Sequence, residues 1–149
     1  MSRLCTIVVS LIVFAASPAL AGPEPAQPKV PRELLEKRLA AAQKVFQENL
    51  FRFKNREGLS SELFGWPERC LEARLALADK QSDRVNAFKT YLSETREVER
   101  IATSYARTGQ GRESDAQAAT YYRLEAEIRL IKEGIEIPPE DKKGAPGKP

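Results

Sequence analysis

A short pattern occurs twice in the chain, 53 residues apart, and it constrains the fold more than any other feature. The first copy places Gly58 before Leu71-Glu72-Ala73, and the second places Gly111 before Leu124-Glu125-Ala126. In each copy a glycine-containing break precedes a stretch with the apolar spacing of an amphipathic helix. Each copy therefore predicts a helix-turn-helix hairpin, and the two copies predict a small all-helical domain.

The first 21 residues have the organisation of a secretory signal peptide. Arg3 supplies a positive charge, residues 4–16 are mostly apolar, and Ala19-Leu20-Ala21 matches a small-residue cleavage site. The apolar run is short for the roughly 20 residues of a membrane-spanning helix, and no later stretch is apolar enough to span a bilayer. We therefore expect cleavage after Ala21, export to the periplasm or the medium, and no membrane span in the mature chain.

The composition argues against several classes of function. The chain has no histidine, which excludes imidazole acid-base catalysis and metal sites with histidine ligands. Loss of the signal peptide removes Arg3 and leaves 23 basic against 21 acidic residues, a net charge of +2 without a dominant basic segment. This near balance does not predict nucleic-acid binding. We expect a non-enzymatic protein with no catalytic residues, no cofactor and no metal.

Proline-rich segments delimit the predicted domain. Residues 22–31 predict an extended linker, and residues 138–149, which begin with two prolines, predict a disordered tail. Residues 32–137 should form two sequential antiparallel hairpins in a four-helix, coiled-coil-like bundle. The apolar spacing predicts helices over about residues 32–55, 60–78, 82–107 and 114–134.

Each predicted helix carries an apolar stripe that we expect to face the core, and the stripe of the third helix has heptad spacing. The first turns of the fourth helix also contain alanines, which let a neighbouring helix approach closely. The expected core positions are Leu35, Leu39, Ala42, Phe46, Leu50 and Phe53; Leu63, Trp66, Cys70, Ala73 and Leu77; Phe88, Tyr91, Thr95, Val98, Ala102 and Tyr105; and Gln117, Tyr121, Leu124, Ile128, Ile131 and Ile135.

Two residues of the second helix leave alternatives open. At Pro67 the helix either kinks or begins anew after a short turn over residues 60–64, and the unbroken apolar spacing favours the kink. Cys70 is the only cysteine of the mature chain. Its helical apolar pattern favours a buried small hydrophobe over a disulfide between chains.

Glycines mark both predicted turns. Gly58 is a candidate left-handed residue at the end of the first helix. Gly109-Gln110-Gly111 could suggest a phosphate-binding loop, but no strand precedes it and no Gly-Lys-Ser/Thr closes it. The segment is therefore expected to be a plain helical turn.

Trp66 and Tyr122 are the candidate partner-contact residues. Tyr122 lies one position off the apolar stripe of the fourth helix, and Trp66 begins the interrupted region of the second helix. The competing interpretation assigns aromatic residues at helical spacing to the core, which is the more frequent outcome. Tyr121 lies on the stripe itself and is expected to be buried.

The second hairpin resembles the helical-hairpin repeat of TolC-like outer-membrane efflux proteins. The resemblance rests on Tyr105, Gly109, Asp115, Ala119 and Ala126 and covers residues 105–133, with a weaker echo over residues 52–77. The chain departs from that family at Arg112 and Arg123, and it is far shorter. Residues 66–78, W-x-x-R-x-L-E-A-x-L-A-L-A, are also similar to helices of small exported bacterial proteins. The resemblance implies an exported location and a helical fold, but no activity.

Two functions are compatible with these expectations. The leading one is a scaffold or coiled-coil protein that binds envelope proteins through a helix face and could also form a homo-oligomer. It predicts an exposed apolar strip, self-association, or both. The alternative is a small periplasmic chaperone or stress sensor that shields client segments, although the LTxxQ motifs of one such family are missing.

Overall fold

The structure, a computed structural model, describes residues 30–58 and 60–139. These residues contain no strand and form the helices α1 (Arg32–Lys54), α2 (Ser60–Leu63), α3 (Trp66–Leu77), α4 (Gln81–Arg107) and α5 (Glu113–Lys132). The expected all-α class is therefore confirmed. The predicted signal peptide, residues 22–29 of the linker and residues 140–149 of the tail lie outside the described residues.

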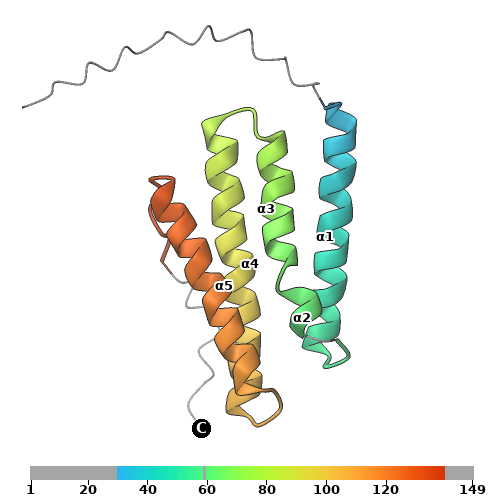
Figure 1. Cartoon of the computed structure of the whole chain (residues 1–149), viewed down its shortest axis with the longest axis vertical. Helices are drawn as coiled ribbons and strands as arrows, with labels where there is room; N and C mark the ends of the chain where they lie inside the picture. The colour runs from blue at the N-terminus through green and yellow to red at the C-terminus, as the bar shows by residue number, and fades with distance from the viewer. Residues whose placement is uncertain (1–29, 59, 140–149) are drawn as a thin grey trace, which may run out of the picture.

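The long helices lie side by side in the order α1, α3, α4 and α5, and neighbours run in opposite directions (Figure 1). The most extensive packing joins α4 with α5, α1 with α3, and α3 with α4. The inner helices α3 and α4 therefore pack against two long neighbours each, whereas α1 and α5 form the edges. This arrangement is compatible with the expected pair of hairpins, which meet through α3 and α4.

The turns that follow α1 and α4 share the same backbone hydrogen bond. The Glu57 N–H donates to the Arg52 carbonyl oxygen at 2.8 Å. The Gln110 N–H, 53 positions later, donates to the Tyr105 carbonyl oxygen at 2.9 Å. Such a bond satisfies a carbonyl group that the helix end would leave without a partner. The duplication seen in the sequence is therefore also a duplication of turn geometry.

Positive φ angles and close approaches repeat in the two turns as well. Arg56 has a φ of 63° and Gly109, at the equivalent position, has a φ of 68°. The expectation that Gly58 adopts this conformation is wrong, because Arg56 does so instead. Gly58 and Gly111 permit close approach: a Cβ atom at Gly111 would lie 2.8 Å from Tyr105 Cβ, and the equivalent distance at Gly58 is 3.1 Å.

Replacing Gly111 with alanine should lower the free energy of unfolding by about 1–3 kcal/mol, because the added methyl group overlaps the helix that precedes the turn. Gly65→Ala is the matched control, since a Cβ there meets nothing within 4 Å and the φ of Gly65 is −82°. This control substitution should leave the free energy of unfolding unchanged or raise it slightly. Urea denaturation followed by circular dichroism measures both, and equal midpoints would contradict the close approach.

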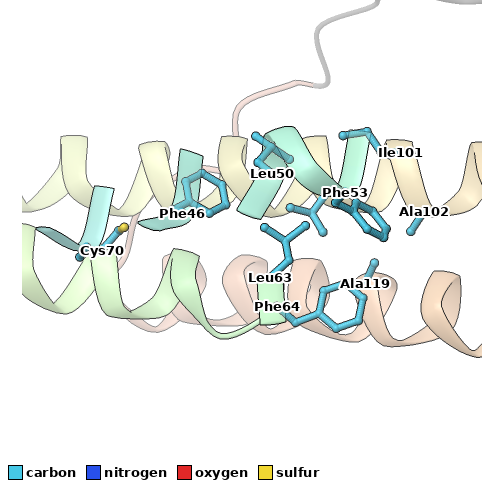
Figure 2. Close-up of a cluster of buried hydrophobic side chains, with 11 residues drawn as sticks. Phe46, Leu50, Phe53, Leu63, Phe64, Cys70, Ile101, Ala102 and Ala119 are labelled. Carbon is cyan, nitrogen blue, oxygen red and sulfur yellow. The ribbon is translucent and has the colours of Figure 1, made fainter. Parts of the chain in front are cut away.

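Two clusters of buried side chains form the core. The cluster nearer the turns draws residues from all five helices, and Figure 2 shows how their side chains converge. The second cluster lies among α3, α4 and α5. The α1 stripe is confirmed at four of its six positions, with Leu35 and Leu39 only half-buried. The main side chains of the first cluster are Phe46, Leu50, Phe53, Leu63, Phe64, Cys70, Ile101, Ala102 and Ala119, and those of the second are Leu71, Phe88, Tyr91, Leu92, Ala126 and Leu130.

The central helix α4 is buried over a wider face than its heptad pattern predicted. Five of the six predicted positions are buried, and Tyr105 is half-buried. Ala87, Leu92 and Ile101 are buried in addition. The face is wide because α4 packs against α3 on one side and α5 on the other.

The chain does not continue as one helix from residue 60 to residue 78. The short helix α2 ends at Leu63, and α3 begins at Trp66 with Pro67 in its first turn. Proline is tolerated there, because the first N–H groups of a helix have no partner within it. The favoured kink at Pro67 is therefore wrong, and the alternative of a new helix is correct to within one residue.

Cys70 is fully buried in the first cluster, as the apolar pattern predicted. Burial raises the pKa of its thiol to about 11, because an apolar environment disfavours the thiolate. At neutral pH the side chain is therefore a protonated thiol and packs as a small hydrophobe.

Beyond α5 the chain folds back onto the helices. Gly134 has a φ of 68° and reverses the chain direction. Ile135 and Ile137 then pack against the second cluster, and the Pro138 carbonyl oxygen accepts a 2.9 Å hydrogen bond from the Arg96 guanidinium. Pro138 was expected to begin the disordered tail, and this contact corrects that boundary.

Ion pairs between neighbouring helices supplement the thin core. Arg74 of α3 and Glu94 of α4 form a bidentate pair with N–O distances of 2.6 and 3.0 Å, and their side chains are only 15% and 13% exposed. Between α5 and α4, Arg123 Nε lies 2.7 Å from a Glu99 carboxylate oxygen. Charges this far from water need such partners, because desolvation penalises an isolated ion strongly.

Candidate functional site

The helix α5 turns its small residues toward the core. Its buried residues are Ala116, Ala119, Ala126 and Leu130. Alanine side chains let the α5 backbone approach α4 closely, as the alanines in the first turns of this helix had suggested. Because the small residues face the core, the opposite side of α5 faces outward.

The apolar stripe that was expected to pack in the core lies instead on the outer face of α5. Tyr121 is 64% exposed, Leu124 and Ile128 are each 44% exposed, and Ile131 is 63% exposed. The expectation that these residues are buried, Tyr121 included, is wrong. We call these four residues the α5 seam.

The residues of the α5 seam have the spacing of the contact face of one helix in a coiled coil. They step by three, four and three positions, so that Tyr121 and Ile128 occupy heptad position a and Leu124 and Ile131 occupy position d. At 1.5 Å per residue the seam is about 15 Å long. Side chains at a and d positions form a strip that is one helix wide, so the seam matches a single partner helix.

Charged side chains border the α5 seam. Glu125 pairs with Arg129 at 3.2 Å within α5. Glu127 is only 19% exposed and pairs both with Arg123 of α5 at 2.8 Å and with Arg96 of α4 at 3.5 Å. Lys132 forms no ion pair with any residue that the structure describes. In heptad terms Glu127 occupies position g, and Glu125 and Lys132 occupy position e. These are the positions whose charges select a coiled-coil partner and its direction.

The structure places the two predicted partner-contact residues on different elements. Tyr122 is half-buried, with its ring centroid 5.5 Å from that of Tyr121 and 5.6 Å from that of Phe64. Trp66 is half-buried at the start of α3, where the Arg69 guanidinium lies 4.5 Å from the ring centroid. Tyr122 therefore lies beside the first residue of the α5 seam, whereas Trp66 lines an open groove between α1 and α3. Their role in partner contact stays a prediction.

The sequence did not predict the α5 seam as an exposed surface, although it contains one signal for it. The helix is apolar on two sides, with alanines and Leu130 on one side and larger residues on the other. A helix with two apolar sides at the edge of a small domain must leave one of them exposed. The pattern alone gave no rule for choosing which side the core would take.

A second hollow lies between the two equivalent turns. This cleft has a volume of about 290 Å³, and its apolar walls include Phe53, Ala102 and Tyr105. The Arg56 guanidinium lies 5.2 Å from the Tyr105 ring centroid and donates a hydrogen bond to Gln110 across the cleft. The described geometry of the Gly109-Gln110-Gly111 segment is that of a helical turn, as predicted.

No protein-family model, curated protein or solved structure matches the chain. The resemblance to TolC-like hairpins therefore stays a prediction. Over residues 30–58 and 60–139, no helix is both long and apolar enough to cross a membrane. The same residues contain no group of three or more potential acidic or cysteine metal ligands. The α5 seam is thus the feature whose geometry most directly suggests a function.

Proposed function

We propose that the protein is an exported, non-enzymatic scaffold that binds envelope proteins through the outer face of α5. The observation that supports this proposal is the exposure of four large apolar side chains at heptad spacing on one helix. Contiguous exposed apolar surface is uncommon on soluble proteins and often marks an interaction site. The signal-peptide pattern of residues 1–21 supports an envelope location for the partner.

The α5 seam can supply useful binding energy. Complete burial of a large aliphatic or aromatic side chain contributes about 1.5–3 kcal/mol. Since each seam residue is about half exposed, its burial by a partner contributes about 1 kcal/mol. Docking one apolar helix face against another is a recurrent way for small proteins to recognise a partner.

Replacing Leu124 and Ile128 with glutamine should abolish partner capture by the tagged mature protein from envelope extracts. Both side chains are exposed and glutamine is a good helix former, so the fold should remain intact. The matched control is Leu34→Gln/Phe51→Gln, which removes two exposed apolar residues from α1. The control should capture the same proteins as the wild type. Capture that survives the α5 substitutions would refute the proposal.

The same assay addresses the chaperone alternative. A scaffold should retain a small set of folded partners, and their number should not rise when the extract is heated. A chaperone should instead retain many unrelated proteins and suppress the aggregation of a denatured model client. That second outcome would replace the scaffold proposal with the client-shielding one.

A further inference from the structure

We infer that the cleft between the two equivalent turns binds a small apolar carboxylate, whose charged group pairs with the Arg56 guanidinium and whose hydrocarbon body packs on the apolar walls. The cleft has a volume of about 290 Å³, close to the lower end of the range for small-molecule sites, about 300–1,000 Å³. The residues that line it do not include the α5 seam. The inference therefore goes beyond the proposed function and uses a different surface.

The backbone conformation of Arg56 indicates that its side chain has a role. Its φ of 63° is left-handed, which is strained for any residue that carries a Cβ atom. Gly109 takes the same conformation in the second turn, with a φ of 68°, and glycine does so without that strain. A glycine would therefore suit the first turn better than an arginine. Strained residues of this kind cluster at ligand sites.

The guanidinium of Arg56 is held at the cleft and has no counterion there. It lies 5.2 Å from the Tyr105 ring centroid and donates a hydrogen bond to the Gln110 side-chain oxygen. Both of these partners are uncharged, and Arg56 forms no ion pair with any residue that the structure describes. A guanidinium has five N–H donors, so several remain for a ligand. The site therefore offers an oriented cation to an anionic group.

The other charges that line the cleft cancel each other. The Asp115 carboxylate accepts two hydrogen bonds from the Arg112 guanidinium, at 3.1 and 3.2 Å. With this pair neutralised, Arg56 leaves the lining residues with a net charge of +1. A single carboxylate matches both that charge and the fork of N–H donors of a guanidinium. The lining therefore favours a monoanion over a neutral or a doubly charged ligand.

The walls of the cleft select a ligand with an apolar body. Phe53 and Ala102 belong to the first cluster and are 7% and 2% exposed. The Tyr105 ring packs edge-on against Phe53, with centroids 5.8 Å apart. The Tyr105 hydroxyl donates a 2.6 Å hydrogen bond to the Lys54 carbonyl oxygen, so the ring is the part left for a ligand. An aromatic or short aliphatic acid therefore fits better than a hydrophilic one.

Isothermal titration of residues 22–149 with benzoate tests the inference. Saturable binding is expected with a dissociation constant below about 1 mM. Benzyl alcohol, which lacks the charge, and acetate, which lacks the ring, should each bind at least about tenfold more weakly. No saturable binding of benzoate up to about 10 mM, or equal binding of either control compound, would overturn the inference.

Substitution of Arg56 locates the site. Arg56→Gly keeps the left-handed turn and removes the guanidinium, so the fold should remain intact while benzoate binding weakens at least about tenfold. Arg56→Lys keeps the positive charge and should restore most of that affinity. Arg69→Gln is the matched control, because Arg69 is also an exposed arginine beside an aromatic ring but lies in the groove between α1 and α3. Wild-type affinity in Arg56→Gly would overturn the assignment of the site.

Thermal unfolding gives a second readout, because the cleft joins two turns that are far apart in the sequence. A ligand that binds only the folded chain raises the unfolding midpoint, by about 5 °C when its concentration is ten times the dissociation constant. This rise should appear with benzoate in the wild type and in Arg69→Gln, and it should be absent from Arg56→Gly at the same concentration. An equal rise in Arg56→Gly would show that benzoate binds elsewhere and would overturn the inference.

The two proposals fail separately. Leu124→Gln/Ile128→Gln should bind benzoate as the wild type does, because the α5 seam does not line the cleft. A chain that binds benzoate through Arg56 but captures no envelope protein would refute the scaffold function alone. A chain that captures envelope proteins through the α5 seam but does not bind benzoate would refute the carboxylate site alone.

Discussion

Replacing Phe46 with alanine is expected to lower the free energy of unfolding by about 3–5 kcal/mol. The Phe46 side chain is 2% exposed and lies in the cluster that joins all five helices (Figure 2). The substitution removes the apolar contacts of a whole ring and leaves a cavity that the surrounding helices fill only in part. Small domains have total stabilities of about 5–15 kcal/mol, so the loss is a large share of the whole.

Thermal and urea denaturation of residues 22–149 measure this loss. Phe51→Ala is the matched control on the same helix, because the Phe51 side chain is 65% exposed. Its substitution should change the free energy of unfolding by less than about 0.5 kcal/mol. Similar losses for the two variants would show that Phe46 does not occupy the core position described above.

The second large effect is expected at the buried ion pair between α3 and α4. Replacing Glu94 with alanine leaves the Arg74 guanidinium without its bidentate partner in a largely water-free position. The expected loss is about 3 kcal/mol, most of which reflects the desolvation of the remaining charge. Because the pair joins the two hairpins, this loss weakens their association directly.

The double variant Arg74→Met/Glu94→Met separates the two contributions. It removes both charges and keeps apolar volume, so its stability should lie within about 1 kcal/mol of the wild type. The exposed pair of Lys37 and Glu33, with side chains 70% and 75% exposed, serves as control, and Glu33→Ala should cost about 0.5 kcal/mol or less. A double variant as unstable as Glu94→Ala would argue against uncompensated charge as the cause.

The turns and the inner helix were the features that the sequence predicted best. The glycines in the 53-residue repeat predicted both chain reversals, since glycine tolerates positive φ and close approach where other residues do not. The heptad pattern of α4 predicted its core because large apolar residues face both neighbours. The sequence did not predict that Arg56, rather than Gly58, takes the left-handed conformation in the first turn. Local propensity favours glycine there, and tertiary contacts between the turns hold the arginine instead.

The outer helix was predicted less well, for a physical reason. Hydrophobic periodicity gives more weight to large side chains, so it assigned Tyr121 and Ile131 to the core. The structure buries Ala119 and Ala126 instead, because small residues allow the closest contact with α4. A periodic pattern locates apolar faces on a helix. When a helix has two apolar faces, the neighbouring helix determines which of them is buried. The periodic pattern of α5 alone therefore could not predict which face packs against α4.

The two helices at the edges of the row, α1 and α5, have different outward surfaces. In solenoid proteins each hairpin rests on the next, and a terminal unit stays soluble when its outward surface is polar. The outward surface of α1 carries the exposed charged residues Lys37, Lys44 and Glu48 beside one large apolar residue, Phe51, so it is better suited to terminate such a stack than the outward surface of α5. The outward surface of α5 is apolar and is suited to receive another unit. A third 53-residue hairpin could therefore be grafted after α5 to lengthen the protein, whereas the same graft before α1 would meet a charged surface.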